Sequence, residues 1–202
     1  MRLFIRKYGR IDEHSASVNG VTLPVTNAKK DTKFLTALYR SLDVDYPKFF
    51  KMDNLSKLGF LASELIFSNM TPRFIPREDV AVLCFNRSSS LETDTAYQAT
   101  IEQDGYFPSP AVFVYTLPNI VTGEIAIREK FFGETSFYIC EDFDAAQICR
   151  TVTEAFQDSD TRTVLAAWAE SFGNRHEVRM MLISSDNDGI PFSEENVRKL
   201  LG

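Results

Sequence analysis

Residues 54–68 are the most restrictive feature of this sequence, because a helix over them would be apolar on nearly every side. The segment reads NLSKLGFLASELIFS, in which apolar side chains recur around the whole helical turn. A helix that is apolar all round is buried on more than one side. Asp53 or Asn54 would cap its N-terminus. The chain must therefore place this helix between other elements rather than on its surface.

The rest of the chain alternates between patterns typical of strands and patterns typical of helices. Strands are expected at 3–11, 18–26, 79–85, 135–140, 163–169 and 178–184, the first two around a turn near Asn19-Gly20. Helices are expected at 31–43, 90–103, 118–131, 143–157 and 193–201, with a loop at Pro108 and Pro110. This order predicts an α/β fold in a single domain over 1–202. Its sheet would be mainly parallel or mixed, with about five strands and helices on both faces.

Charge and composition argue against several classes of function. A formal charge of −6 argues against nucleic acid as a partner, because proteins that bind a phosphate backbone carry clustered lysine and arginine. No apolar run approaches the roughly 18 residues of a membrane span, so we expect none. Three cysteines without a CxxC pair predict reduced thiols and a cytoplasmic protein. With two histidines and nine glycines, we expect no metal site, no glycine-rich phosphate loop and no cofactor.

Two histidines and one acidic turn are the titratable groups to weigh. His14 and His176 both fall in predicted turns, where each is a solvated residue or, alternatively, a general base. Glu141, Asp142 and Asp144 lie where the fourth predicted strand turns into a helix. Acidic residues at a helix N-terminus stabilise the helix through capping and its dipole. The alternative interpretation is that this turn is a degenerate active-site elbow.

The segment from Ser109 to Ile127, SPAVFVYTLPNIVTGEIAI, resembles the β-ketoacyl synthases of the thiolase superfamily when it is followed on to Gly133. In that family this stretch is a Ser-Pro segment, an Asn-x-x-x-Gly helix and the glycine before the nucleophile strand. Other matches keep the family's order: its first long helix at 49–65, its first inner strand at 79–86, and the strand after the nucleophile helix at 163–170. The resemblance covers about residues 45–185 and implies a thiolase-like half, a β-ketoacyl synthase N-terminal-like domain.

The departures from the family pattern concern the catalytic groups. Counted on from Gly133, Asp142 stands where the family has its cysteine nucleophile, and a carboxylate cannot carry a thioester-linked acyl chain. Cys140 lies two residues earlier, beside acidic neighbours that disfavour a thiolate. Both family histidines come from the second half of a synthase, which we expect this chain to lack. The resemblance therefore implies a subunit without catalytic residues of its own.

Such subunits are called chain-length factors, because they pair with an active synthase and shape its acyl tunnel. The resemblance implies that role here, in fatty-acid, polyketide or aryl-polyene-type synthesis, with a full-length β-ketoacyl synthase or a second copy of the chain as partner. An acidic acyl carrier protein would be engaged only indirectly, because this chain is itself acidic. The residues expected to line the tunnel or face the partner are Val112, Phe113, Tyr115, Thr116 and Asn119, with Gly123 allowing close approach. Further aromatic residues expected at the partner are Phe131, Phe132, Phe137 and Tyr138.

Two other functions stay open at this point. The chain is alternatively an active 3-oxoacyl synthase, an acyltransferase that uses Cys140, or an Asp142-dependent decarboxylase or hydrolase. It is alternatively a homodimer that binds acyl chains by itself, with a phenylalanine-rich face that encloses the ligand. If the fold is half of a five-layer sandwich, we expect its middle helices to lack a covering layer and to expose some of these rings.

Overall fold

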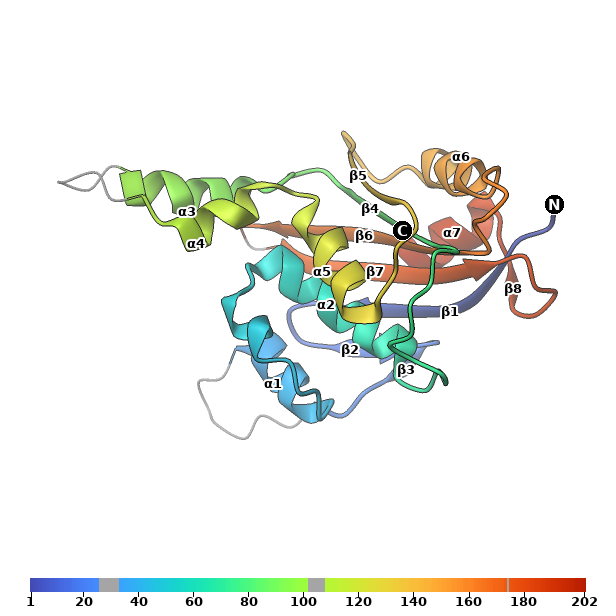
Figure 1. Ribbon diagram of the computed structural model, residues 1–202, viewed down its shortest axis with the longest axis horizontal. Coiled ribbons are helices and arrows are strands. Elements are labelled where there is room, and N and C mark those ends of the chain that lie inside the picture. Colours follow the sequence, from blue (N-terminus) through green and yellow to red (C-terminus); the bar gives the residue numbers. More distant parts are fainter. Residues whose placement is uncertain (26–32, 102–107, 174) are drawn as a thin grey trace.

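The computed structural model is a twisted sheet with helices on both faces and an arm that projects from one end (Figure 1). It describes residues 1–25, 33–101, 108–173 and 175–202. Two hydrophobic clusters, one on each face of the sheet, form the core. Within the described ranges no single helix is long and apolar enough to cross a membrane, although the bent pair Pro110–Thr116 and Ile120–Glu129 passes on length and composition together.

The sheet has eight strands in the described part of the chain, in the order β3-β2-β1-β7-β6-β4-β5, with β8 paired to β1. The strands are β1 (Phe4–Ile11), β2 (Ala16–Val18), β3 (Val21–Thr22), β4 (Val80–Asn86), β5 (Thr135–Ile139), β6 (Thr163–Phe172), β7 (Arg175–Ser184) and β8 (Ile190–Pro191). Strand β4 is parallel to both neighbours, β5 and β6, and the other pairs are antiparallel. Every residue of β4 is buried, as a strand covered on both faces requires.

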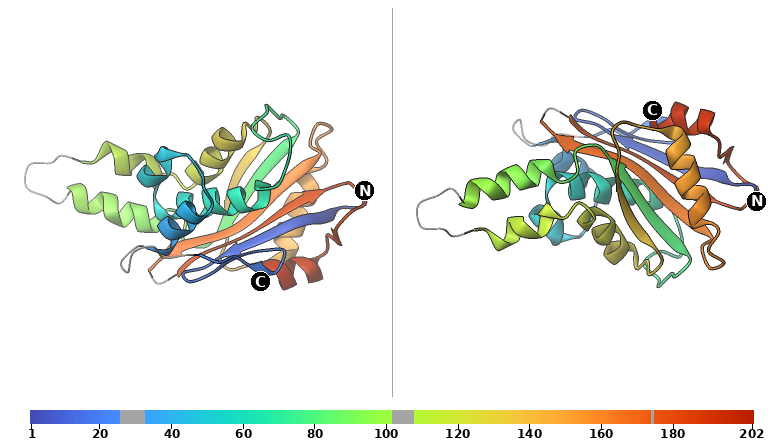
Figure 2. Two further views of the ribbon diagram at one scale, coloured as in Figure 1. Left: turned by 90° about the horizontal axis from the view of Figure 1, so that it is seen from below. Right: turned by 90° about the horizontal axis from the view of Figure 1, so that it is seen from above.

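The helices divide between the two faces (Figure 2). They are α1 (Phe34–Ser41), η1 (Pro47–Lys51), α2 (Asn54–Phe67), α3 (Leu91–Ile101), α4 (Pro110–Phe113), η2 (Val114–Thr116), α5 (Ile120–Glu129), α6 (Ala145–Ala155) and α7 (Glu194–Leu201). Helix α2 lies on one face against β1, β6 and β7, and α1 and α5 pack over it. Helices α6 and α7 pack together on the other face. Helices α3 and α4 form the arm.

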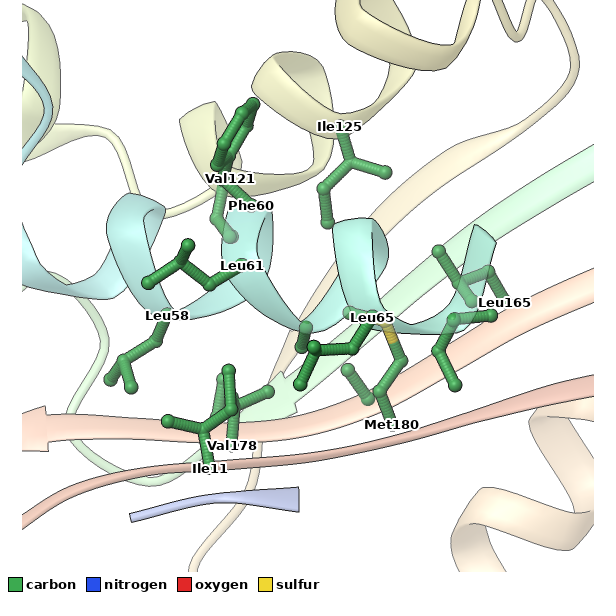
Figure 3. Close-up of a cluster of buried hydrophobic side chains, with 14 of the residues drawn as sticks. Ile11, Leu58, Phe60, Leu61, Leu65, Val121, Ile125, Leu165, Val178 and Met180 are labelled. Atoms are coloured by element: carbon green, nitrogen blue, oxygen red, sulfur yellow. The ribbon is translucent and has the colours of Figure 1, made fainter. Parts of the chain in front are cut away.

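Helix α2 confirms the all-round apolar pattern, because nearly every one of its residues is buried. Asp53 caps it by accepting a hydrogen bond from the Ser56 amide at 2.8 Å. Figure 3 shows its lower side packed on the sheet and its upper side against Val121 and Ile125 of α5. A side chain at Gly59 would overlap Val121, so this glycine allows the two helices to approach closely.

Four charged side chains are enclosed on the same face as α2. Glu64 accepts from Arg128 Nε at 2.6 Å and pairs with Arg73 Nη2 at 2.9 Å. Arg73 Nε also donates to Glu129 at 2.9 Å. Burial raises the pKa of Glu129, although the bond from Arg73 opposes that effect. Each buried carboxylate is paired with an arginine, as buried charges require. The ion pairs also link α2 to α5 and to the loop before β4.

Several predicted elements differ from the observed ones. The sheet has eight strands rather than about five, since three short strands extend it, and most of its pairs are antiparallel. The Asn19-Gly20 turn joins β2 and β3, not the segments 3–11 and 18–26, because residues 23–25 leave the sheet. The expected loop at Pro110 is helical, since proline fits the first turn and Ser109 caps it. Residues 26, 31, 32, 102 and 103 of predicted elements lie outside the described residues.

The outer side of the α6 and α7 layer is charged. Helix α6 turns Ile148 and Val152 toward the sheet and leaves Arg150 and Glu154 exposed. Helix α7 exposes acidic residues in its first turn and basic residues in its last. Both helices are amphipathic, with a polar side suited to water. None of the exposed large apolar side chains among the described residues lies on α6 or α7, and six of the thirteen lie in the segment from α4 to β5.

Candidate functional site

The predicted elbow is an open loop at the carboxyl ends of β4, β5 and β6. The Cys140 amide donates to the Asn86 carbonyl at 2.7 Å, which fixes the start of the loop beside β4. Asp142 is 79% exposed in its side chain and pairs with Arg87 at 3.3 Å. The Arg87 amide donates to the buried Glu170 carboxylate at the end of β6. The three strand ends therefore meet, and the groups they bring together are charged rather than nucleophilic.

Asp144, not Asp142, occupies the N-cap of α6. Its carboxylate accepts from the amides of Ala146 at 2.8 Å and Gln147 at 3.2 Å. The acidic turn therefore caps the helix, as one of the two interpretations of the sequence predicted. Burial raises the pKa of Cys140, and the nearby Asp144 carboxylate adds to the rise. The elbow therefore holds its most accessible thiol in the protonated form, which is a poor nucleophile.

A groove lies where the arm joins the start of α2. It has a volume of about 300 Å³, close to the lower end of small-molecule sites. Its apolar lining comes from Met52, Ala96, Ala111, Val112 and Tyr115. Two of the residues predicted for the tunnel, Val112 and Tyr115, thus share one concave surface. At its inner side lie Asp53, Asn54 and Glu92, which sequence reasoning did not assign to a ligand site.

The other residues predicted for the tunnel lie around the groove rather than in it. Phe113 is 54% exposed and its ring contacts Tyr97 of α3. Thr116 hydrogen-bonds within its own turn, and its carbonyl accepts from Ser90 at 2.6 Å. Asn119 is exposed at the start of α5. An added Cβ at Gly123 would meet nothing within 4 Å among the described residues, so Gly123 is not a point of close approach within this chain.

Tyr115 is positioned by a hydrogen bond to a buried glutamate that was not among the predicted site residues. Its hydroxyl donates to Glu124 at 3.2 Å, and Lys48 pairs with the same carboxylate at 2.8 Å. Burial raises the pKa of Tyr115, and Glu124 raises it further. A glutamate in the middle of the apolar run VTGEIAI was the available signal, because buried carboxylates need partners.

The segment from α4 to β5 carries exposed apolar side chains on the arm, on α5 and beside the edge strand β5. Strand β5 is the last strand of the sheet order, so its outer edge faces no other described strand. We call the following set the apolar edge: Phe113, Val114, Leu117, Ile127, Phe132 and Ile139, all of which are about half exposed or more. Of the other aromatic residues predicted there, Phe131 is buried, and Phe137 and Tyr138 are half-buried. Unpaired edges and exposed apolar side chains are typical of interfaces.

His176 does not lie in a solvated turn, as was expected, because β6 and β7 extend to meet at Gly173. It pairs across the sheet with Ser171, and its Nδ1 lies 3.2 Å from the Ser171 hydroxyl oxygen. That hydroxyl donates to Glu92 of the arm. Asn54 donates to the same carboxylate at 3.0 Å. His14, in contrast, is 90% exposed in its side chain, as expected.

The fold relates the chain to solved ketosynthase structures, whereas no family sequence model and no curated protein sequence matches it. A chain of the ishigamide ketosynthase/chain length factor matches with a TM-score of 0.68 at 12% identity, over 94% of this chain and 63% of that one. A complex of the ketosynthase ApeO with its chain length factor ApeC from Xenorhabdus doucetiae matches at 0.61 and 14%, over 92% and 80%. The chain has the ketosynthase fold. A third match, the AntDE:AntF complex of a ketosynthase with its acyl-carrier protein, has a TM-score of 0.61 at 12% identity, over 91% and 62%.

These matches confirm the predicted thiolase-like fold of the ketosynthase and chain-length-factor structures. The chain spans less than two thirds of the matched chains in the first and third structures. Gly133, predicted as the glycine before the nucleophile strand, precedes β5, and a side chain there would overlap the carbonyl oxygens of Glu78 and Val80.

Proposed function

We propose that the chain is a non-catalytic, chain-length-factor-like subunit that pairs with an active ketosynthase and shapes its acyl tunnel. The observation that carries this proposal is the groove, because it is lined by Val112 and Tyr115 of the segment that the family resemblance assigns to the tunnel. Its apolar walls suit a hydrocarbon chain, for which each buried methylene contributes about 0.8 kcal/mol. A bulkier side chain at Val112 would shorten the space available to that chain.

The elbow supports the non-catalytic part of the proposal. Asp142 is exposed and paired with Arg87, and the thiol of Cys140 has a raised pKa. Neither group is prepared to form a thioester. In this proposal the partner subunit supplies both the nucleophile and the surface on which an acidic carrier protein docks.

The apolar edge supports a partner subunit. Phe132 is 67% exposed and Ile139 is 60% exposed, and both flank an unpaired strand edge. A second β-strand could pair there through main-chain hydrogen bonds while covering these side chains. We assign this edge to the ketosynthase, with a second copy of the chain as the competing occupant that the experiment separates.

The test is purification of the tagged chain from its native host, followed by identification of the co-purifying proteins and analysis of the products. We expect a full-length ketosynthase, and we expect Val112→Phe to shorten the products while preserving the complex. Phe132→Asp should release the partner, whereas Glu154→Ala on the far face should not. Recovery of the chain as a homodimer without a synthase would instead favour an acyl-chain-binding protein. A stable acyl adduct on Cys140, lost in Cys140→Ala, would refute the non-catalytic assignment.

A further inference from the structure

A set of hydrogen-bonded polar side chains lines part of the groove. Asn54 lines this groove and also a second cavity, of about 270 Å³, on the other side. Glu92 faces the groove, and His176 faces the second cavity. We call Asn54, Glu92 and His176 the polar wall. Phe34, Leu35 and Thr36 at the start of α1 contribute to the far side of the second cavity.

Hydrogen bonds between four elements hold the wall together. Asn54 of α2 donates to Glu92 of α3 at 3.0 Å, and Ser171 of β6 donates to the other oxygen of the same carboxylate. Ser171 also contacts His176 of β7 at 3.2 Å, and His176 Nε2 lies 4.0 Å from Glu92. The wall is therefore a connected network rather than a loose set of surface side chains.

We propose that the polar wall sets the maximum length of acyl chain that the groove accepts. The inference rests on the proposed function and adds its length-determining residues. A hydrocarbon end that passed the wall would have to break the hydrogen bonds that Glu92 accepts from Asn54 and Ser171, and an apolar chain offers these groups no replacement partner. Opening the wall would join two cavities of similar volume and extend the space for a chain end.

The experiment uses the complex co-purified with the tagged chain, with product length as the readout. Asn54→Ala combined with Glu92→Ala should lengthen the products by at least one elongation cycle. Adding Thr36→Phe, which fills the second cavity from α1, should reverse the lengthening. A loss of stability alone would not be reversed by such a change. Glu92→Gln keeps the size of the side chain and should lengthen the products less than Glu92→Ala.

Val112→Phe separates the failure of this inference from that of the proposed function. If Val112→Phe shortens the products and the folded double variant leaves them unchanged, the proposed role of the wall is overturned and the proposed tunnel is not. Products that respond to neither change would overturn the tunnel and the wall together. If the double variant does not fold, Glu92→Ala replaces it. Lengthened products that Thr36→Phe shortens again would support the wall, and unchanged products would overturn it. Glu154→Ala, a carboxylate removed from the opposite face, is the matched control.

Discussion

Helices cover both faces of the sheet, but one face carries two layers of helices and the other carries one. On one face α2 is buried beneath α1 and α5, together with four charged side chains. On the other face α6 and α7 form one layer with a charged outer side. The groove lies on the first face, and the elbow leads into the second. The groove therefore lies on the more deeply packed face, whereas the elbow is an exposed loop.

The local structure of the elbow makes few demands on the sequence. The elbow needs only Gly133, which fits between the carbonyls before β4, and a cap for α6. Neither requirement involves a nucleophile. The groove, in contrast, depends on side chains from η1, α2, α3, α4 and η2, so its shape requires the arm to be held in place.

The largest expected effect concerns buried and exposed ion pairs on the two faces. Glu64→Ala leaves Arg128 without its carboxylate in a buried site and should lower the free energy of unfolding by about 3–5 kcal/mol. Asp142→Ala removes the exposed pair with Arg87 at the elbow and should cost about 0–1 kcal/mol. Urea denaturation of both variants measures the difference. Equal losses would mean that the two faces are not packed to different depths.

The reactivity of the cysteine thiols tests whether the face that carries the elbow holds a nucleophilic thiolate. Burial raises the pKa of Cys149 to about 11, with Glu194 and Asp144 adding to the rise. The pKa of Cys140 is raised in the same direction. Because the thiolate is the reactive form, alkylation of Cys149 at neutral pH should be roughly 100-fold slower than that of a free cysteine and should accelerate steadily with pH. Mass spectrometry of iodoacetamide-treated protein measures this, and rapid modification of Cys140 at neutral pH would contradict the view of the elbow as inert.

The sequence predicted the layered fold because its strongest signals are local. The all-round apolar pattern of α2, the strand predicted at 79–85 and the helix predicted at 193–201 each depend on neighbouring residues, and each is confirmed. The polar wall could not be predicted, because Asn54, Glu92 and His176 come from three elements that are distant in sequence. Nothing near His176 in the sequence indicates that β6 and β7 extend far enough to bring it beside the arm.

Two glycines test how tightly the deeper face is packed. Gly59→Ala places a methyl group against Val121 and should destabilise the protein by about 1–3 kcal/mol, despite the better helix propensity of alanine. Gly123→Ala, on the open side of α5, should stabilise the protein by about 0.5–1 kcal/mol. Thermal unfolding of the two variants measures whether each substitution raises or lowers the stability of the protein. A neutral Gly59→Ala would indicate that α2 and α5 can separate at little cost.

The smallest expected effect is a pH dependence that originates in the groove. Burial raises the pKa of Asp53, although hydrogen bonds from Ser56 and Thr93 oppose it. A carboxyl whose folded pKa lies above its unfolded value contributes stability at low pH, and that contribution is lost as the pH rises through the folded pKa. Asp53→Asn keeps a capping side chain and removes this loss, so it should gain under about 1 kcal/mol at neutral pH. Hydrogen bonds from Arg77 lower the pKa of Asp79 outside the groove, so the ionised carboxylate stabilises the protein above its unfolded pKa and that contribution is lost as the pH falls through the folded pKa. Asp79→Asn should therefore be less stable than the wild type at neutral pH, and the difference should shrink as the pH falls. Urea titrations of both variants across the acidic range would show opposite slopes, and parallel slopes would mean that the groove does not bury Asp53 in solution.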